Sequence, residues 1–551
     1  MPRFCHLGAK RNYLHASIKN RSMKQIPSGF GDRKPISPLH LKHILRQGEL
    51  IPWEGPSLDV ESPLCDPETG KRYLLGSLPR MDAKAGMLAL ESAERAFQQG
   101  QGEWPSASTA QRVAAAETFI KAMLAVRTEV VDLLMWEIGK PQADAAKEFD
   151  RTVDYLRDTI QNVKEMDRNA VRFGEDSGFV AQVRRVPLGV ALIMGPYNYP
   201  LNETFTTLFP ALLMGNTVVF KPAKYGVLLI APLLEAFRDS FPPGVVNILF
   251  GKGRETVSDI MASGRISVLS FIGTSKGANE LKKLHPNSHR LRAILGLDAK
   301  NPGITLPDAD LDLAVSQTVS GALSFNGQRC TALKIQWVHR SLHDEFVNRL
   351  VASVEQLKWG APWDSEVKIT ALPEHGKVEF LQAMVDDALA HGAQVANPSG
   401  AQHSATFYSP TVLTGVTPAM RIYHEEQFGP LVPVVAYDEL DEPMKYIMHS
   451  NFGQQMSIFG RDPQAIGRLV DACAHQVGRI NLNAQAQRGP DAFPFTGRKD
   501  SAEGTLSVHD ALRAFSIRSM VAFPATVENK ELVSAVLRER SSNFLSTDFY
   551  L

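Results

Sequence analysis

Hydrophobic and polar positions follow two different periods along this chain. From residue 84 to residue 166, apolar side chains recur every three or four positions, as with Leu90, Ala93 and Phe97, and predict amphipathic helices. From about residue 179 to residue 272, short runs rich in β-branched residues predict strands that alternate with helical segments. This alternation predicts a doubly wound parallel sheet.

A second α/β stretch begins near Asn301. A helical pattern covers residues 311–325, and the apolar runs ALKIQWVH and LVPVVAYD predict strands. The first of these strands directly follows the segment with the most distinctive polar residues, which is discussed below. The sequence therefore predicts an α/β protein with two α/β units.

Charge and cysteine content exclude several classes of protein. The 59 Lys and Arg residues balance the 59 Asp and Glu residues, so we expect neither a nucleic acid nor an anionic membrane as partner. No apolar run reaches the length of about 18 residues that a membrane-spanning helix needs. The cysteines Cys5, Cys65, Cys330 and Cys473 lack CxxC spacing, so we expect no disulfide framework and no metal site.

The N-terminus has a composition of its own. Residues 1–31 contain six basic and no acidic residues, without the apolar core of a secretory signal. We expect a cytoplasmic protein with a basic extension over residues 1–50. A disordered tail, a true start at Met23 and a mitochondrial transit peptide are the interpretations that remain open for that extension.

The segment SFNGQRCTA, residues 324–332, is the first candidate for catalysis. Only a thiolate is nucleophilic, and Arg329 beside Cys330 favours that form. The alternative is a small cysteine packed in the core, which normally has apolar neighbours, whereas here they include Asn326, Gln328 and Thr331. Cys330 is therefore a candidate nucleophile.

Further polar or glycine-rich turns follow the predicted strands, where ligands bind in open α/β sheets. Asn198 in PYNYP places an amide there, which either donates to an oxyanion or forms a turn. Lys221 in NTVVFKPAK supplies a cation suited to cofactor hydroxyls or phosphates. FGKGRE, which contains Gly253, begins like a dinucleotide-binding turn without its third glycine, and Gly273 in FIGTS marks a similar turn.

The segments PYNYP, NTVVFKPA, FIGTS, SFNGQRCTA, EEQFGP and PFTGRKDS together resemble the aldehyde dehydrogenase superfamily over roughly residues 55–525. GQRC and QRGPDAFPF are most similar to its NADP-dependent non-phosphorylating glyceraldehyde-3-phosphate dehydrogenases. The resemblance implies a Rossmann-type cofactor domain (51–165 and 187–300), an α/β catalytic domain (301–505), a small β oligomerisation element (166–186 and 506–527) and a tail (528–551). Exposed strands in that element would pair with a second subunit, giving a homodimer or homotetramer.

The resemblance also implies the chemistry. Cys330 would attack a small-molecule aldehyde, the Asn198 amide and the Cys330 N–H would hold the oxyanion, and hydride transfer to nicotinamide would leave a thioester. The implied cofactor-binding residues are Lys221, Lys224, Gly253, Gly273, Thr274, Glu426 and Phe428. NADP is the expected cofactor, with NAD as the alternative, because Lys224 stands where NAD-using members commonly have a glutamate.

One position departs from the family. Its general base is the Glu of E-L-G-G-K-x-P, and Gly296 occupies that place in G-L-D-A-K-N-P. Asp298, on the same side of a strand, is a candidate substitute base, or else a surface charge. Two rivals to aldehyde oxidation follow: an enzyme that passes its thioester to coenzyme A, and a non-catalytic member of the family.

The expected substrate is a small phosphorylated aldehyde, with glyceraldehyde-3-phosphate as first choice. Arginine binds phosphate oxygens through two parallel hydrogen bonds, and a tyrosine hydroxyl can donate one more. The predicted substrate-binding residues are Arg329, Arg488, Tyr199 and Arg157. The alternative is that Arg329 faces away and that Arg488 pairs with Asp491 at the surface.

Overall fold

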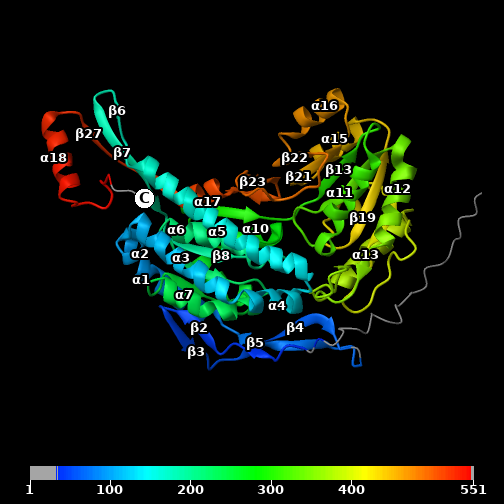
Figure 1. The fold of residues 1–551 in the computed structure, drawn as a ribbon, viewed down its shortest axis with the longest axis horizontal. Helices are drawn as coiled ribbons and strands as arrows, with labels where there is room; N and C mark the ends of the chain where they lie inside the picture. The colour runs from blue at the N-terminus through cyan, green and yellow to red at the C-terminus, as the bar shows by residue number, and fades with distance from the viewer. Residues whose placement is uncertain (1–32, 34, 67, 548–551) are drawn as a thin grey trace, which may run out of the picture.

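The computed structural model describes residues 33, 35–66 and 68–547, and its first large sheet has six strands (Figure 1). In spatial order they are β10 (Val246–Ile248), β9 (Thr217–Lys221), β8 (Val190–Met194), β11 (Val268–Ile272), β12 (Arg292–Gly296) and β25 (Ala502–Glu503). The first five are parallel, and β25 is antiparallel to β12. The strand order reverses between β8 and β11, which is where such sheets bind ligands.

Helices cover this sheet and build the first domain. They include α1 (Ala83–Phe97), α3 (Thr109–Ala125), α4 (Arg127–Ile138), α5 (Gln142–Ala170), α6 (Asn202–Leu213), α7 (Leu234–Ser240) and α10 (Ser275–Leu284). Both α1 and α6 pack against β8 and β9. Ser108 caps α3 in a reciprocal arrangement with Gln111, as expected for a serine that precedes a helical run.

The second large sheet has seven strands and forms the right-hand part of Figure 1. Their order is β17 (Gln394–Val395), β18 (Thr411–Thr414), β19 (Leu431–Tyr437), β14 (Leu333–His339), β13 (Asn301–Thr305), β21 (Gln455–Phe459) and β22 (Arg479–Leu482). Helices α11 (Leu311–Leu323) and α12 (Arg340–Glu355) both contact β14.

Strand β19 shows why the strands of this sheet have continuous apolar sequences. Its odd-numbered residues Leu431, Val435 and Tyr437 join one buried cluster, whereas Val432 and Val434 join another. Successive side chains of a strand point to opposite faces, so each face of the sheet is covered by its own core.

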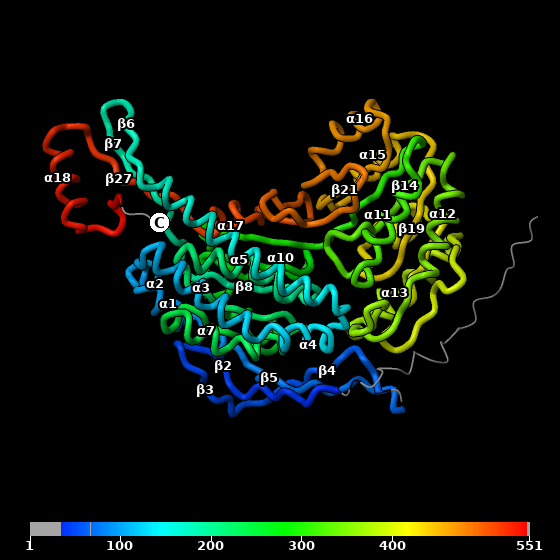
Figure 2. The backbone as a smooth tube through the Cα atoms, viewed as in Figure 1, coloured from blue at the N-terminus to red at the C-terminus, as the bar shows by residue number. Residues whose placement is uncertain are grey.

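A third sheet of three antiparallel strands lies at the upper left of Figure 1. It consists of β6 (Phe173–Asp176), β7 (Phe179–Pro187) and β27 (Ser516–Pro524). Strand β27 pairs with β7 along its whole length, and α18 (Val527–Arg538) follows it. Figure 2 shows α5 running from this sheet across the first domain towards the second.

The N-terminal segment differs from the expected extension over residues 1–50. Residues 1–32 lie outside the described residues, but β1 (Leu39–His40) pairs with β5 (Arg72–Pro79), and β2 (His43–Arg46) forms a hairpin with β3 (Glu49–Pro52). Ile44 and Leu45 are buried against the first domain. The described part of this segment is therefore folded. In the described part of the chain, every helix is too short or too polar to cross a membrane.

Candidate active site

Cys330 lies in the half-buried loop between the short 3-10 helix η4 (Ser324–Gly327) and β14. Its carbonyl oxygen accepts hydrogen bonds from Asn301 Nδ2 at 2.8 Å and Lys334 Nζ at 2.9 Å. Gly327 has a φ of +71°, and a Cβ there would lie 2.6 Å from the Gly429 carbonyl oxygen. The glycine of this motif is therefore required by backbone conformation and by close contact.

Asn198 follows β8 and is brought to the same loop. Its Nδ2 donates to the Gln328 carbonyl oxygen at 2.8 Å, two residues before Cys330. Tyr197 donates to Glu374 at 2.7 Å and to the Gln328 side chain at 3.2 Å. An amide nitrogen carries two hydrogens, so the second one is available for a ligand oxygen beside Cys330.

A buried ion pair holds the turn that carries Asn198. Lys140 contacts Glu148, and its Nζ also donates to the Asn198 carbonyl oxygen at 2.7 Å. Glu148 in turn accepts from the backbone N–H groups of Leu201 and Asn202, at 3.0 and 3.1 Å. Burial lowers the pKa of Lys140, opposed by the charge of Glu148. The pair fixes the approach of α6 to the cysteine loop.

The electrostatic field at the cysteine has opposing parts. Burial and, second, the negative charge of Glu203 raise the pKa of the Cys330 thiol. The charge of Lys334, a hydrogen bond with Gln454 and the charge of Arg488 lower that pKa. The balance keeps the thiol protonated at neutral pH, so a proton must leave before the sulfur can attack.

Arg329 does not have the position expected beside the thiolate. Its Nη2 donates to the Gly321 carbonyl oxygen at 2.9 Å and to Gln485 at 3.3 Å. The guanidinium therefore binds the end of α11, and the cations that lower the pKa of Cys330 are Lys334 and Arg488. Adjacency in the sequence did not predict the position of the Arg329 side chain, because successive side chains of an extended loop point in different directions.

The side chain of Asp298, in the loop after β12, contacts Ser275, the first residue of α10. Its Oδ2 accepts from the Ser275 N–H and from the Ser275 hydroxyl, both at 2.7 Å. The carboxylate thus caps a helix, where the helix dipole stabilises its charge. Its role as a substitute base stays a prediction. A Cβ added at Gly296 would meet only Ile272, at 3.5 Å, within ordinary van der Waals distance.

The predicted cofactor residues line the carboxyl ends of the first sheet. Lys221 ends β9 and is buried, and burial lowers its pKa to about 8. Gly253 lies beside it, since an added Cβ would be 3.7 Å from Lys221 Cε. Gly273 donates its N–H to the Gly296 carbonyl oxygen at 2.9 Å, and Thr274 caps α10. These residues flank the point where the strand order reverses.

The remaining cofactor candidates come from both domains. Lys224 is exposed, with its ammonium 4.8 Å from the centre of the Tyr225 ring. Glu426 accepts from Lys334 Nζ at 2.7 Å and from the Ala299 N–H at 3.2 Å. Phe428 has a φ of +42°, and its ring lies 5.9 Å from that of Tyr197. The structure brings Glu426 and Phe428 close to the loop of Cys330 through Lys334 and Tyr197.

The arginines predicted to bind substrate separate into two groups. Arg488 is buried, with its Nη1 on Glu203 and its Nε 3.4 Å from Asp491. Arg157 has a side chain 59% exposed and lies 3.8 Å from Asp154, so it is not part of that group. Arg151, two turns earlier on α5, binds Asp491 at 2.7 Å and takes the place expected for Arg157.

Tyr199 packs into the wall next to Asn198. The Lys140 ammonium lies 3.5 Å from the centre of its ring, and the Phe325 ring lies 6.3 Å away. Burial raises the pKa of the Tyr199 hydroxyl, so it remains a hydrogen-bond donor at neutral pH.

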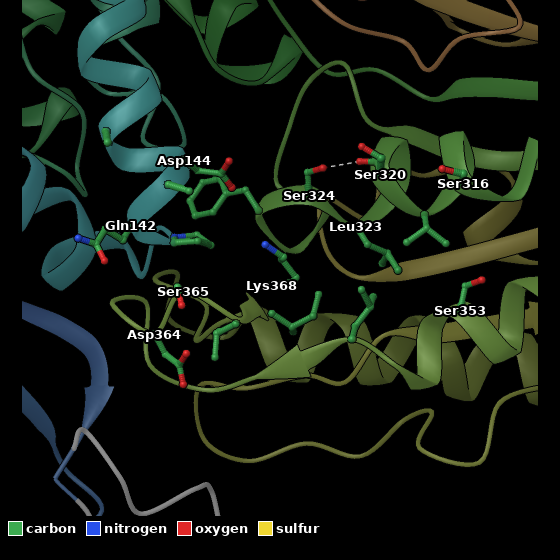
Figure 3. A pocket seen from close by; sticks show the side chains of 18 residues that line it. Gln142, Asp144, Ser316, Ser320, Leu323, Ser324, Ser353, Asp364, Ser365 and Lys368 are labelled. Carbon is green, nitrogen blue, oxygen red and sulfur yellow. Dashed lines mark hydrogen bonds between the residues drawn. The ribbon is translucent and has the colours of Figure 1, made fainter. Parts of the chain in front are cut away.

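A cavity of about 730 Å³ lies behind the cysteine loop (Figure 3). It is lined by the start of α5, by α11 and α12, and by β16 (Val367–Ile369). Ser324 and Phe325 of η4 form part of its wall, and the Ser324 hydroxyl donates to the Ser320 carbonyl oxygen at 2.5 Å. Cys330 is not among its lining residues, so this cavity is separate from the reacting thiol.

Sequence reasoning missed four side chains around Cys330: Glu203, Arg151, Lys334 and Gln454. Two of them carried a signal, because Lys334 and Glu203 are charged residues inside apolar segments that the structure buries. A buried charge is rare unless it is paired. The other two could not be found from local pattern, since they reach the site through tertiary packing.

The sequence pattern of the aldehyde dehydrogenase family matches residues 55–521. The chain belongs to the aldehyde dehydrogenase family. The predicted fold class and the prediction of an oxidoreductase that acts on aldehydes are thereby confirmed. The match covers both large sheets and most of the third, and it places Cys330, Asn198 and Glu426 within family segments.

Several individual aldehyde dehydrogenases are similar to this chain. The NADP-dependent glyceraldehyde-3-phosphate dehydrogenase of Arabidopsis thaliana is 30% identical over 468 residues, covering 84% of this chain and 91% of its own. The enzyme of that name from Triticum aestivum is 32% identical, over 73% of this chain and 80% of its own. The crystal structure of the Bacillus halodurans C-125 enzyme complexed with NADP has a TM-score of 0.81 and 31% identity, covering 89% of this chain and 100% of that one.

Proposed function

We propose that this aldehyde dehydrogenase oxidises a small phosphorylated aldehyde, with glyceraldehyde-3-phosphate as first choice, and uses NADP. The substrate class is inferred from the surroundings of Arg488. Its side chain is buried, acts electrostatically on Cys330, and keeps its Nη2 without a hydrogen-bond partner among the described residues. A buried guanidinium nitrogen without a partner is costly, and a ligand oxygen would satisfy it.

The chain's own groups support the chemistry of an aldehyde dehydrogenase. The Cys330 sulfur, once deprotonated, attacks the aldehyde carbon to form a thiohemiacetal, and the carbonyl oxygen becomes an oxyanion. The Asn198 amide, held by Lys140 through its own carbonyl, donates to that oxyanion. Bound NADP would supply the acceptor for the hydride that leaves the former aldehyde carbon. Water must then hydrolyse the resulting thioester, which releases the acid and returns Cys330 to its thiol form.

The cofactor assignment rests on the cationic end of β9. Gly253 leaves open the space beside the Lys221 methylene chain that a Cβ would fill. Lys224 lies three residues on and is exposed, so it can reach a 2′-phosphate with a charge-assisted hydrogen bond. Relatives named as NADP-dependent, and one solved with NADP, support this choice.

A second function is favoured by Gly296. Without a carboxylate at that position, activation of water for hydrolysis of the thioester lacks its usual base, and a thiol nucleophile needs less help. Transfer of the acyl group to coenzyme A is therefore the rival proposal. The second rival proposal is that the protein is a catalytically impaired member of the family.

One experiment separates these functions. Enzyme, NADP and glyceraldehyde-3-phosphate are mixed, and reduced cofactor is followed through the first turnover and beyond. A burst followed by turnover without added thiol supports the proposal, and turnover only with coenzyme A supports the rival. If the wild type shows no burst and behaves like Cys330→Ala, the protein does not oxidise this aldehyde.

The substrate class has its own test. We expect kcat/KM for glyceraldehyde-3-phosphate to exceed that for glyceraldehyde at least tenfold, and Arg488→Ala to remove the difference. The exposed Arg157→Ala is the matched control and should leave it unchanged. A preference for glyceraldehyde or a medium-chain aldehyde in the wild type would contradict the substrate class but not the oxidation of aldehydes.

A further inference from the structure

A buried carboxylate paired with Arg488 has no part in the chemistry above. Glu203 lies in the first turn of α6, five residues after Asn198, and its side chain is only 11% exposed. Its Oε2 contacts Arg488 Nη1, and its Oε1 accepts from Asn202 Nδ2 at 3.3 Å. Its negative charge also raises the pKa of Cys330, which places it within electrostatic reach of the sulfur.

Glu203 belongs to a chain of four charges. Arg488 lies between Glu203 and Asp491, and Asp491 accepts two hydrogen bonds from Arg151, at 2.7 and 3.0 Å. Two positive and two negative charges therefore balance without a substrate. A phosphate dianion bound at Arg488 would add two negative charges next to the Glu203 carboxylate, and like charges that close repel strongly in a buried site.

We propose that Glu203 is a specificity-determining residue that competes with the substrate phosphate for Arg488. In the free enzyme it is the counter-ion of that guanidinium. A phosphate takes over the Nη1 that Glu203 holds and the Nη2 that has no partner, so Glu203 must withdraw when the phosphorylated aldehyde binds. The carboxylate thereby weakens binding of phosphorylated aldehydes relative to unphosphorylated ones. This inference rests on the proposed substrate class.

Glu203 could instead serve as the base that replaces the missing carboxylate at Gly296. The contacts of Glu203 argue for the specificity role, since its Oε2 is engaged by Arg488 and its Oε1 already accepts a hydrogen bond from Asn202. The two roles predict opposite effects on the phosphorylated substrate. Removal of a competitor improves its binding, whereas removal of a base slows release of the acid.

The test uses Glu203→Gln, which keeps the size of the side chain and a carbonyl oxygen for Asn202. Glu345→Gln, the same change in an exposed ion pair with Arg349, is the control. Inorganic phosphate is the binding probe, measured as an inhibitor of glyceraldehyde oxidation and by the rise in Tm that it causes. We expect Glu203→Gln to lower the inhibition constant of phosphate and KM for glyceraldehyde-3-phosphate at least tenfold, whereas KM for glyceraldehyde, which carries no phosphate, should fall by a much smaller factor.

Glu203→Asp provides a second variant that retains the charge and draws it back by one methylene group. It should change the same constants in the same direction by a smaller factor, which keeps the test informative if Glu203→Gln folds poorly. An unchanged phosphate inhibition constant in both variants, or a larger burst with slower turnover in Glu203→Gln, would overturn the specificity role.

The outcome is separable from that of the proposed function. If the wild type prefers unphosphorylated aldehydes while Glu203→Gln gains inhibition by phosphate, the proposed substrate is wrong and the competition is right. If the wild type prefers the phosphorylated aldehyde and neither variant alters phosphate binding, the proposed substrate stands and the competition is wrong.

Discussion

At the scale of single residues, the site combines the Cys330 thiol, the proposed nucleophile, whose pKa is raised by burial, with cations that lower that pKa. Lys334 is the clearest of these, because it is almost wholly buried, contacts Glu426 and donates to the Cys330 carbonyl oxygen. Its position four residues after the cysteine places it at the base of β14, beneath the loop. The reactivity of the thiol is therefore set by the strand that follows it as much as by the loop itself.

This gives a prediction about pH. The pKa of Cys330 lies above the ordinary value for a thiol, so the burst rate should rise with pH from neutrality towards that pKa. Lys334→Met removes a charge that lowers the pKa, so the profile should move to higher pH, with the largest loss of rate near pH 7 and recovery at alkaline pH. The measurement is the burst rate against pH, with Lys300→Met, which removes another buried lysine, as control. A loss of rate that is equal at every pH would mean that Lys334 acts on structure alone.

Gly296 carries a second prediction at this scale. A Cβ added at Gly296 meets only Ile272, at an ordinary van der Waals distance, so Gly296→Glu should place a carboxylate where the family has its base and should raise steady-state turnover without thiol severalfold. Gly296→Gln, of the same size but not basic, should not. Asp298→Asn tests the substitute base in the same assay, through a larger burst with slower turnover. An unchanged turnover in Gly296→Glu would show that release of the acid is not limited by a missing base.

At the scale of elements, the approach of α6 to the cysteine loop depends on one buried pair at the start of α5. Lys140 and Glu148 are both fully buried, and together they engage the backbone of Asn198, Leu201 and Asn202. A buried charge left alone is far more costly than a surface charge left alone. The turn between β8 and α6 is thus held by this ion pair in addition to the apolar packing of Leu201 and Phe205.

We expect Lys140→Met to lower the free energy of unfolding by about 3–5 kcal/mol, because Glu148 would remain buried without its partner. Activity should fall as well, since Asn198 loses the contact that fixes its carbonyl. Lys282→Met, which breaks an exposed pair with Glu503, is the control and should cost less than about 1 kcal/mol. Urea unfolding of the variants measures both values, and equal losses would contradict the role of burial.

Most helices and strands around the first large sheet could be predicted from the sequence. The helices from 83 to 170 follow from apolar periodicity, because each buries one stripe. The strands from 190 to 272 follow from short apolar runs, because parallel strands such as β8 and β9 are buried on both faces. The third sheet was expected only through the resemblance. Strands β1 to β3 were missed, since two- and four-residue strands leave no periodic signal. Glu203 and Arg488 are 285 positions apart, and local pattern carries no information about their contact.

At the scale of the whole molecule, apolar side chains gather on the third sheet. Phe179 and Val183 on β7 are 53% and 40% exposed, and Met520 on β27, which pairs with Val183, is 63% exposed. These three side chains share one face of the sheet, whereas Ile517, 47% exposed, lies on the other face. Large apolar side chains clustered on a strand pair favour association with a second copy of the chain. The expectation of a homodimer or homotetramer remains a prediction, and this surface is where we expect the contact.

Met520→Asp should therefore shift the protein towards a monomer, because a charge at the centre of an apolar contact must be desolvated when the subunits meet. Sedimentation velocity of the wild type and the variant at several concentrations measures the shift. Met448→Asp, at an exposed methionine on α15 (Asp441–His449) in the catalytic domain, is the control. An unchanged sedimentation coefficient in Met520→Asp would place the contact elsewhere.

Helix α5 has a consequence for how this protein can change over evolution. It spans 29 residues, or about 43 Å, with Glu148 and Arg151 near one end and the strands of the third sheet at the other. An insertion of one residue in a loop is absorbed locally, but one inside α5 turns everything beyond it by about 100°. Such an insertion would leave either Arg151 or the third sheet in register, never both. The length of this helix is therefore fixed by two sites at once, and deletions or insertions can accumulate only in the loops around it.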